Sequence, residues 1–239
     1  VNAVNKISST GRSCSEIADY LTGIGDECFT AYSVGPRSNN AFCISPAWEC
    51  KLHAFLSRGT GEQGYFSPVS TSRLLRLIRR LKPDVVHLRN MHANYLNINK
   101  VLRYLAKHDI ATVVTLHDCF VYTGKCTHYT SDGCYRWQSG CHDCPKIKCD
   151  NPSWFFDRTG KMWRDKKNGW NAIPRLAVIG VSDWITGEAK KSPMFARAKI
   201  IERIYNWIDL DVFRPDSVVA AKEKLGLTGK KIILGVASR

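Results

Sequence analysis

The amino-acid sequence predicts an α/β protein built on a Rossmann-like, doubly wound parallel sheet. Residues 84–88, 111–116 and 176–181 are apolar runs without polar alternation, which is typical of strands buried on both faces. Stretches with an apolar stripe at helical spacing lie between these runs. Apolar strands that alternate with amphipathic helices favour a parallel sheet covered by helices.

The first part of the chain begins like a βαβ unit. Residues 1–5 are expected to end a first strand, residues 8–12 to form a loop of small residues, and residues 17–21 to lie in a helix. Residues 27–34 are expected to form the second strand. Residues 35–70 are rich in Gly, Ser, Pro and Asn without a sustained period, so we expect loops with short elements there.

The rest of the chain continues the alternation. Residues 73–82 carry an apolar stripe with arginines mainly on the other side, which predicts a helix that the following proline ends. Further helices are expected over residues 101–108 and near residues 184–191. Residues 200–205 and 231–236 have the composition of two more strands.

The composition is that of an ordinary globular protein. Hydrophobic residues make up 44% of the 239 residues and charged residues 23%, so nothing indicates disorder. The longest apolar runs are strand-sized and fall short of the roughly 20 residues that a membrane helix needs, so we do not expect the chain to span a bilayer. The chain begins with Val1 rather than methionine, so its natural start could be missing.

The charge is strongly unbalanced. The formal net charge is +14, from 35 Lys and Arg against 21 Asp and Glu. Such an excess favours anionic partners, which include nucleic acid, acidic lipid headgroups and phosphorylated small molecules. It does not choose among them, and a solvated basic surface is the default explanation.

The candidate binding residues follow the expected strands. In doubly wound sheets ligands bind at the carboxyl ends of the strands. The polar residues at those places are 10–12, 87–92, 117–118 and 182–183.

Several segments resemble the motifs of one family. Residues 87–97 (HLRNMHANYLN) and 115–124 (TLHDCFVYTG) resemble the HLHNLHGYYLN and TLHDCWAFTG segments of bacterial polysaccharide glycosyltransferases of the colanic-acid type. Residues 155–158 (FFDR) resemble their FFDRS, and residues 181–184 (VSDW) continue the series. Residues 204–215 resemble the NGID…VF.P connector that joins the two domains of retaining GT-B glycosyltransferases. The motifs occur in the same order over nearly the whole chain.

The resemblance implies a domain organisation. Residues 1–206 would form the amino-terminal, acceptor-side domain of a GT-B enzyme, with a Cys-rich loop at residues 119–149. Residues 207–239 would contain the interdomain connector and the first strand of the donor domain. Because that family holds the nucleotide mainly with the second domain, we expect this chain alone to be inactive.

The resemblance also implies a reaction. It is the transfer of a sugar, of the hexosyltransferase type, from a nucleoside-diphosphate sugar to a hydroxyl of a glycan or lipid-linked acceptor with retained configuration, in cell-surface polysaccharide biosynthesis. No catalytic metal is expected. The expected location is the cytoplasm, with a peripheral position at the inner face of the membrane as an option.

The resemblance assigns roles to two of the strand ends. His117 would contact the donor sugar and help to stabilise developing charge, and Asp118 would orient His117 or hold an acceptor hydroxyl. A structural cap of the next turn is about equally plausible for Asp118. The loop of small residues would approach the donor pyrophosphate with its backbone N–H groups, and the alternative is a tight turn without a binding role. The donor-binding candidates in that loop are Thr10, Gly11 and Arg12.

The third strand end supplies candidates for acceptor recognition. They are His87, Asn90 and His92, although His87 could instead pack inside, beneath the loop. Ala93 replaces the glycine and Arg89 the histidine that the family motif has at these places. Both departures lie on the acceptor side, so they weaken the inference about the acceptor most.

Six of the ten cysteines fall between residues 119 and 149. Four of them have the pattern C-x7-C-x6-C-x2-C, and a C-x2-C pair lets two thiolates reach one tetrahedral zinc ion. We expect a structural zinc held by these four, with Cys149 or His142 as a substitute ligand. Reduced thiols, or disulfides in an exported protein, are the alternatives. The expected ligands are Cys126, Cys134, Cys141 and Cys144.

Residues 154–170 mix aromatic with basic side chains. This pattern fits a surface that meets an anionic membrane and a lipid-linked acceptor. It fits slightly better a helix with an aromatic side in the core and a basic side in solvent. The charge, the cysteines and the aromatics also suggest an alternative function, a zinc-containing nucleic-acid-binding protein, but that function leaves the parallel sheet unexplained. We therefore expect no nucleic-acid partner. A non-catalytic module that only binds the acceptor is a third option.

Overall fold

The computed structural model describes residues 1–215 and 217–235. The chain divides into two compact units, Val1–Tyr205 and Asn206–Arg239. No helix of the described residues is both long and apolar enough to cross a membrane.

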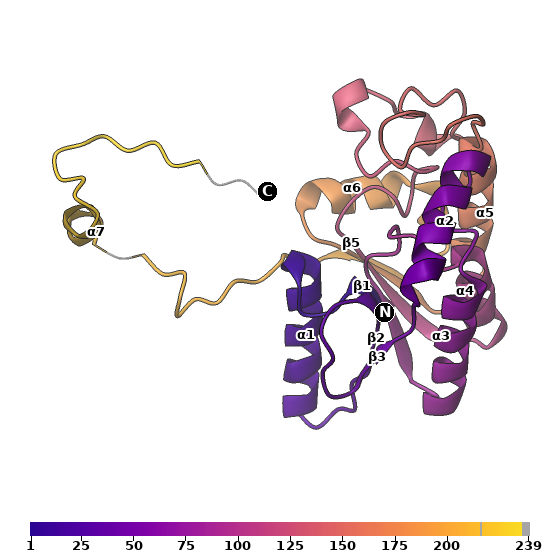
Figure 1. The fold of residues 1–239 in the computed structure, drawn as a ribbon, viewed down its shortest axis with the longest axis horizontal. Helices are drawn as coiled ribbons and strands as arrows, with labels where there is room; N and C mark the ends of the chain where they lie inside the picture. The colour runs from indigo at the N-terminus through magenta and orange to yellow at the C-terminus, as the bar shows by residue number, and fades with distance from the viewer. Residues whose placement is uncertain (216, 236–239) are drawn as a thin grey trace. The chain divides into compact units, whose positions relative to one another are not determined.

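The first unit contains parallel strands in two hydrogen-bonded groups. One group has the order β1-β2-β3 and the other the order β4-β5-β6-β7 (Figure 1). The expected parallel α/β architecture is therefore confirmed. The strands are β1 (Asn2–Val4), β2 (Thr30–Val34), β3 (Ala41–Cys43), β4 (Val85–Leu88), β5 (Ala111–Leu116), β6 (Leu176–Gly180) and β7 (Ile200–Arg203).

Two backbone hydrogen bonds join the two groups of strands, and the Asn2 side-chain oxygen accepts a third from the Asn90 N–H at 3.2 Å. The amino group of Val1 donates to the His87 carbonyl oxygen at 2.6 Å, and the backbone N–H of Arg89 donates to the Val1 carbonyl oxygen at 3.1 Å. β1 therefore lies beside β4, and the strand order β3-β2-β1-β4-β5-β6-β7 reverses its direction between these two strands. In doubly wound sheets the ligand crevice opens at such a reversal, outside the carboxyl ends of the strands.

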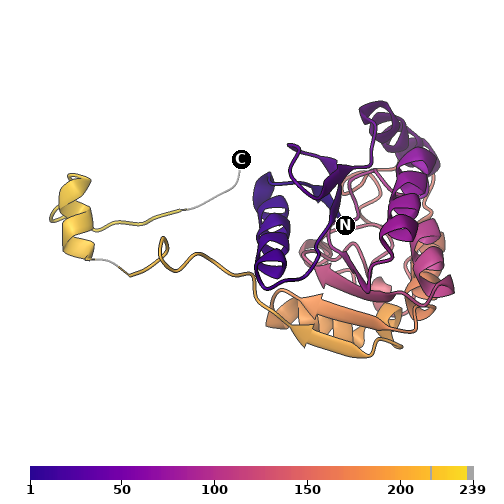
Figure 2. The same cartoon turned by 90° about the horizontal axis from the view of Figure 1, so that it is seen from below.

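Helices cover both faces of the strands. In the first unit α3, α4 and α5 contact one another in series on one face, and α1 and α6 lie on the other (Figures 1 and 2). Side chains cap several of these helices, since Asn97 accepts the Lys100 N–H and Ser182 accepts the Ile185 N–H. The helices are α1 (Ser8–Gly23), α2 (Ala47–Thr60), α3 (Pro68–Leu81), α4 (Ile98–Lys107), α5 (Thr159–Asn171) and α6 (Asp183–Lys191), with short 3-10 helices η1 (Thr130–Asp132), η2 (Arg136–Gln138) and η3 (Pro193–Phe195).

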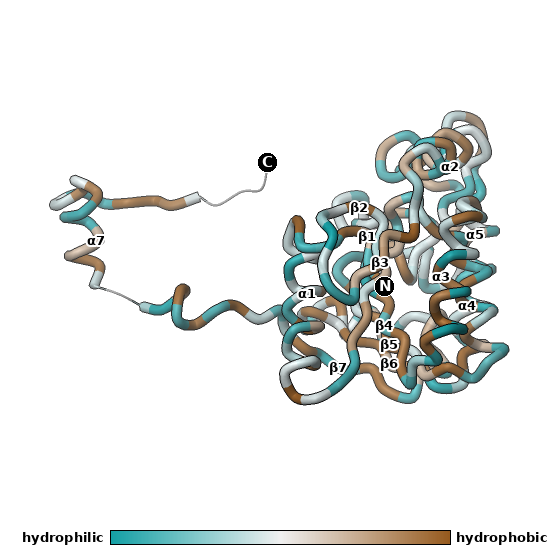
Figure 3. The backbone as a smooth tube through the Cα atoms, turned by 60° about the horizontal axis from the view of Figure 1, so that its bottom comes forward, coloured by the Kyte–Doolittle hydropathy of each residue, from teal (hydrophilic) through white to brown (hydrophobic). Residues whose placement is uncertain are grey.

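The hydrophobic core lies between the strands and α3, α4 and α5. Leu88, Val114 and Val178 in the central strands and Leu102 and Leu105 in α4 have no exposed surface. Figure 3 shows β4, β5 and β6 as hydrophobic segments. These are the apolar runs that predicted buried strands, and the helices between them pack their apolar stripes on the same core.

The expected loop at residues 8–12 is wrong, because α1 already begins at Ser8. The connection between β1 and α1 consists of residues 5–7, with Lys6 in the left-handed backbone region (φ 58°). Gly11 is buried, and a Cβ there would lie 3.1 Å from Val4 Cγ2 and 3.2 Å from the Lys6 nitrogen. The glycine therefore allows close helix–strand packing rather than a tight turn.

The expectation of loops over residues 35–70 is also wrong. The segment contains β3, the fourteen-residue helix α2 and the beginning of α3. The sequence pattern did not predict α2, because the buried residues of this helix are Glu49, His53 and Ser57, which are polar. A search for an apolar core-facing stripe cannot find such a helix.

The expected strand at residues 231–236 is absent from residues 231–235, and Val236 lies outside the described residues. In the described part of the second unit, the regular element is the short helix α7 (Val218–Lys224). A strand needs a neighbour for its backbone N–H and C=O groups, and an apolar sequence alone does not supply one.

Candidate active site at the carboxyl ends of β4 and β5

The ends of β4 and β5 bring the candidate residues together. These strands pair in parallel, with Leu88 beside Val114, so the residues that follow them lie at one edge of the sheet. Arg89 comes directly after β4, and His117 and Asp118 come directly after β5. The amino-terminal part of α1, which follows β1, contributes Ser13 to the same place.

His117 and Arg89 form the centre of this site. Arg89 Nη2 donates to His117 Nε2 at 3.0 Å and to Ser13 Oγ at 2.8 Å. Because Nε2 of His117 accepts a hydrogen bond, a neutral ring carries its proton on Nδ1. Burial, together with the nearby Arg89 charge, lowers the pKa of His117 to about 4, while Asp118 acts weakly in the other direction. His117 is therefore a neutral imidazole near pH 7, with its Nδ1–H available as a donor.

Arg89 is an unusual buried cation. Its side chain is only 4% exposed, and its Nε and Nη1 atoms have no hydrogen-bond partner among the described residues. No carboxylate of the described residues pairs with it. An uncompensated guanidinium at the strand ends favours an anionic or strongly polar group beside it.

Asp118 pairs with His92 rather than with His117. The His92 Nε2 atom lies 2.9 Å from Asp118 Oδ2, and the Phe120 N–H donates to Asp118 Oδ1 at 2.9 Å. Burial alone would raise the pKa of Asp118, but the hydrogen bonds from His92 and from the Phe120 backbone outweigh it and lower the pKa. The second bond is the turn-capping contact that the structural alternative for Asp118 anticipated.

The acceptor candidates separate into two groups. Asn90 and His92 lie in the segment after β4, where the Asn90 side-chain oxygen accepts the His92 N–H at 3.4 Å. His87 lies within β4 instead, and its Nε2 atom is 2.8 Å from Thr115 Oγ1 of β5. Burial lowers the pKa of His87 to about 3, so this residue behaves as a neutral, structural histidine. The environment of His87 is therefore that of the alternative in which this residue packs inside the domain.

The donor candidates of α1 are also separated. Gly11 is buried against β1, whereas Arg12 is exposed to solvent. The Thr10 carbonyl oxygen accepts a hydrogen bond from Asn2 Nδ2 at 3.2 Å, so it serves the packing of α1 on β1. Of this part of the helix, Ser13 reaches the Arg89–His117 pair. The sequence patterns missed Ser13 and gave Arg89 no role, although its replacement of the family's histidine was the signal that marked the position.

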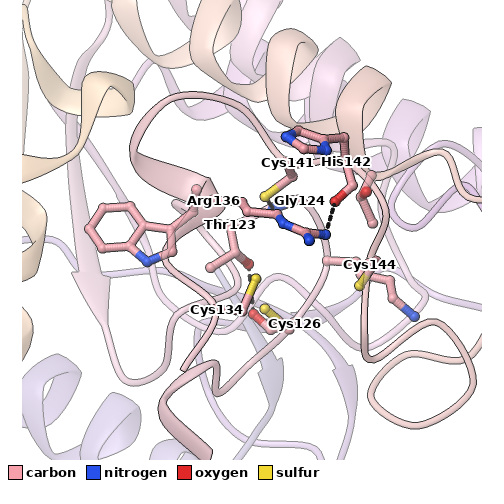
Figure 4. A pocket seen from close by; sticks show the side chains of 11 residues that line it. Thr123, Gly124, Cys126, Cys134, Arg136, Cys141, His142 and Cys144 are labelled. Carbon is pink, nitrogen blue, oxygen red and sulfur yellow. Dashed lines mark hydrogen bonds between the residues drawn. The ribbon is translucent and has the colours of Figure 1, made fainter. Parts of the chain in front are cut away.

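The four expected zinc ligands line one small pocket (Figure 4). Its volume is about 20 Å³, which is the space of one or two water-sized atoms. The Gly124 N–H donates to Cys141 Sγ at 3.2 Å at the wall of this pocket. The cysteines are Cys126, Cys134, Cys141 and Cys144.

The placement of these side chains does not form a finished metal centre. In residues 1–215 and 217–235, no three Cys, His, Asp or Glu side chains are arranged so that they could hold a metal ion. Burial raises the pKa of the Cys126 and Cys144 thiols, and that of Cys141 to about 12, so without a bound cation these thiols are protonated. A zinc ion there stays a prediction.

The aromatic residues of 154–170 divide between surface and core. Met162, Trp163 and Trp170 of α5 are buried, as the expected core-facing helix requires. The aromatic residues before the helix are exposed, with Phe155 75% exposed.

Comparisons with known proteins give the chain its family. No solved structure matches it. The putative colanic acid biosynthesis glycosyl transferase WcaC of Escherichia coli (strain K12) is 33% identical over 102 residues, which cover 40% of this chain and 24% of that relative. The family model described as Glycosyltransferase Family 4 matches residues 11–212, which include the β4 and β5 strand ends, and the chain therefore belongs to glycosyltransferase family 4.

Proposed function

We propose that this chain forms the acceptor-side half of a hexosyltransferase that moves a sugar from a nucleoside-diphosphate sugar to a hydroxyl of a glycan or lipid-linked acceptor, with retained configuration. The observation that carries the proposal is the Arg89–His117 pair at the ends of β4 and β5, beside the reversal of strand order. Family membership supports sugar transfer. The name of the relative, which refers to colanic acid biosynthesis, supports a place in cell-surface polysaccharide synthesis. A position at the cytoplasmic face of the membrane is a further part of the proposal.

In this proposal, His117 acts as a neutral hydrogen-bond donor rather than as a base. Arg89 donates a hydrogen bond to Nε2 of His117, and the lowered pKa of His117 keeps its ring uncharged. The Nδ1–H of the ring then donates to an oxygen of the donor sugar. The charge of Arg89 favours a site where negative charge develops on the leaving diphosphate. A fixed donor and a fixed charge stabilise that transition state without reorganisation during the reaction.

The His92–Asp118 pair serves the acceptor in the same proposal. Asp118 is ionised near pH 7 because its pKa is lowered, so its carboxylate can accept a hydrogen bond from an acceptor hydroxyl. The Asp118 side chain is 18% and the His92 side chain 28% exposed, which leaves part of the pair accessible. The Phe120 N–H holds the carboxylate in place.

The experiment is a transfer assay of the full-length protein with a panel of nucleoside-diphosphate hexoses and lipid-linked or free glycan acceptors. We expect a glycoside product whose anomeric configuration, read by NMR, matches that of the donor. An inverted product would overturn the retaining mechanism. A folded protein that transfers no sugar from any donor would overturn the function itself.

Nucleic-acid binding, the alternative that the charge suggested, explains less. Family membership accounts for the parallel sheet and for the strand-end motif, which nucleic-acid binding leaves unexplained. No separate geometric observation favours it.

A further inference from the structure

Helix α2 has its polar face inside and an apolar face outside. Its buried residues are Glu49, His53 and Ser57, which recur at helical spacing. The large apolar residues point outward at the same spacing and keep between 47% and 59% of their surface exposed. They are Trp48, Leu52 and Phe55. An amphipathic helix of a monomeric protein has the opposite orientation.

Specific hydrogen bonds fix this orientation. The Glu49 carboxylate accepts the N–H groups of Val69 and Ser70 at 2.6 and 2.8 Å, at the beginning of α3. His53 Nδ1 lies 2.7 Å from Ser67 Oγ, the residue before α3. A carboxylate at a helix N-terminus is stabilised both by the orphan N–H groups and by the helix dipole. The polar face of α2 is thus held inside, and its apolar face must lie on the surface.

A second exposed apolar segment lies against α2. Trp154, Phe155 and Phe156 precede α5 and are 42%, 75% and 50% exposed. The rings of Phe55 and Trp154 are 5.5 Å apart between centroids, and the Trp154 N–H donates to the Arg58 carbonyl oxygen at 2.7 Å. Almost one hundred residues separate the two segments in sequence, yet they form one surface. We name the residues Trp48, Leu52, Phe55, Trp154, Phe155 and Phe156 the aromatic patch.

Basic side chains surround the aromatic patch, while the neighbouring acidic groups are engaged. Lys51 and Arg58 are exposed on α2 and have no acidic partner among the described residues, and Arg158 lies over the Phe156 ring at 5.4 Å. The Glu49 carboxylate is buried against the N-terminus of α3, and Glu62 pairs with Lys161. Asp157 is exposed beside Phe156 and accepts the backbone N–H groups of Cys144 and Thr159, so its charge offsets one of the three cations. The patch therefore combines exposed aromatic rings with net positive charge.

We propose that the aromatic patch docks the protein onto an anionic lipid bilayer. Aromatic rings and leucine enter the boundary between headgroups and acyl chains, and lysine and arginine at the rim attract acidic headgroups. The surplus of positive charge complements a negatively charged leaflet. A polar or acidic protein surface would leave the exposed rings without apolar contacts.

The position of the patch connects it to the candidate site. The segment after α2 reaches the acceptor side, because Gln63 Nε2 donates to the His92 carbonyl oxygen at 3.3 Å and to Asn94 Oδ1 at 2.6 Å. Docking would place this side of the domain near a lipid-linked acceptor, and that consequence rests on the proposed function. The docking itself is measured without donor or acceptor, so docking and transfer can fail separately.

The test is co-flotation of the full chain with vesicles of phosphatidylcholine alone and with vesicles that contain 30% phosphatidylglycerol in place of part of it. We expect at least about tenfold stronger binding to the anionic vesicles, with a decrease at high salt. Brominated acyl chains should quench tryptophan fluorescence, and a Trp48→Phe/Trp154→Phe variant should lose most of this quenching.

Surface variants locate the contact. Leu52→Ser/Phe155→Ser should weaken vesicle binding at least about tenfold, because two exposed apolar groups no longer enter the bilayer. Lys51→Glu should weaken it about fivefold and reduce the salt dependence. The matched controls are Tyr20→Ser on α1, whose side chain is 68% exposed, and Lys107→Glu at the end of α4, and both should bind as the unchanged protein does.

Several results would overturn the proposal. They are equal or negligible binding of the unchanged protein to both vesicles, binding that the patch variants retain, and a patch-dependent dimer that binds no vesicles. A thermal melt of each variant excludes loss of folding as the cause of weaker binding. Because every substituted residue is exposed to solvent, we expect melting temperatures close to that of the unchanged protein.

Discussion

The strand-end site and the Cys-rich loop differ in how sequence distance relates to contact. At the ends of β4 and β5, Arg89 and His117 are 28 residues apart in sequence and meet at 3.0 Å. In the Cys-rich loop, Cys141 and Cys144 are three residues apart and line one pocket with two more cysteines, yet their side chains do not form a metal centre. Regular strands hold the first site, whereas irregular backbone surrounds the second.

The difference shows what a scaffold contributes. Parallel pairing in fixed register determines where the residue after each strand lies, so the strand-end contacts need no ligand. Around the pocket the backbone hydrogen bonds belong to local turns, such as that from the Cys134 N–H to the Tyr129 carbonyl oxygen, and no strand pairing between residues 119 and 149 determines where each sulfur points. A bound cation would have to draw the thiolates together there, and binding free energy would become folding free energy.

The largest expected effect tests the strand-end site. His117→Ala removes the donor that the proposal assigns to the sugar, and we expect the transfer rate to fall about a hundredfold or more. Arg89→Gln should also lower kcat, and it should raise the pKa of His117, which is measurable by NMR titration. His108→Ala, at the end of α4, is the matched control and should leave transfer unchanged. An active His117→Ala enzyme would remove the strand ends from the reaction.

The second prediction concerns the Cys-rich loop. Protein purified without added zinc should contain about one zinc ion per chain, and chelation should lower its melting temperature by several degrees. Cys141→Ser should lose the ion, whereas Cys43→Ser, at an exposed cysteine outside the pocket, should keep it. Less than about half an equivalent of zinc with four titratable thiols would contradict the prediction and leave the pocket a cluster of reduced cysteines.

The third prediction uses pH to compare histidines. Burial lowers the pKa of His53 and His117 to about 4 and that of His87 to about 3. Between these values and about 6.5 the unfolded chain binds protons that the folded chain does not. The free energy of unfolding should therefore fall as pH is lowered from about 6.5 to about 4.

Urea titrations at a series of pH values measure this slope. His53→Gln should make the dependence on pH shallower, because one buried neutral histidine is removed. His108→Gln should leave it closer to that of the unchanged protein. A stability that rises on acidification over this range would show that these rings are charged in the folded protein.

The smallest expected effect separates two glycines of α1. Gly11→Ala should destabilise the protein by about 1–3 kcal/mol, because its Cβ would press on Val4 and on the Lys6 backbone. Gly23→Ala meets nothing within 4 Å and should stabilise the same helix by up to about 1 kcal/mol. Thermal unfolding of both variants measures the difference. Equal effects would mean that the contact between α1 and β1 can relax.

Whether the sequence predicted an element depended on whether the buried residues of that element are apolar or polar. β5 was predicted at its observed bounds because none of its residues is exposed and four of the six are apolar. α2 was missed because its buried side chains are polar, so its period points to a surface rather than to the core. The residues of α1 that were expected to bind a donor instead pack a glycine against β1.

The sequence predicted where the candidate site lies, but not which side chains form hydrogen bonds with one another there. The strand-end rule led to His117, His92 and Asp118, because it depends only on where apolar runs stop. The rule could not show that Asp118 bonds His92 instead of His117, nor that Arg89 bonds His117. Side-chain direction and the distance between strands decide those contacts.

The sequence by itself determined the α/β class, the central strands and the family, because buried strands and motif order are local or linear patterns. Only the tertiary structure decided that β1 lies beside β4, that Arg89 is a buried cation at the strand ends, and that α2 and residues 154–156 form one aromatic surface. Each of these depends on contacts between residues that are far apart in the chain. Such contacts follow from the packing of the whole domain, which no local pattern of residues contains.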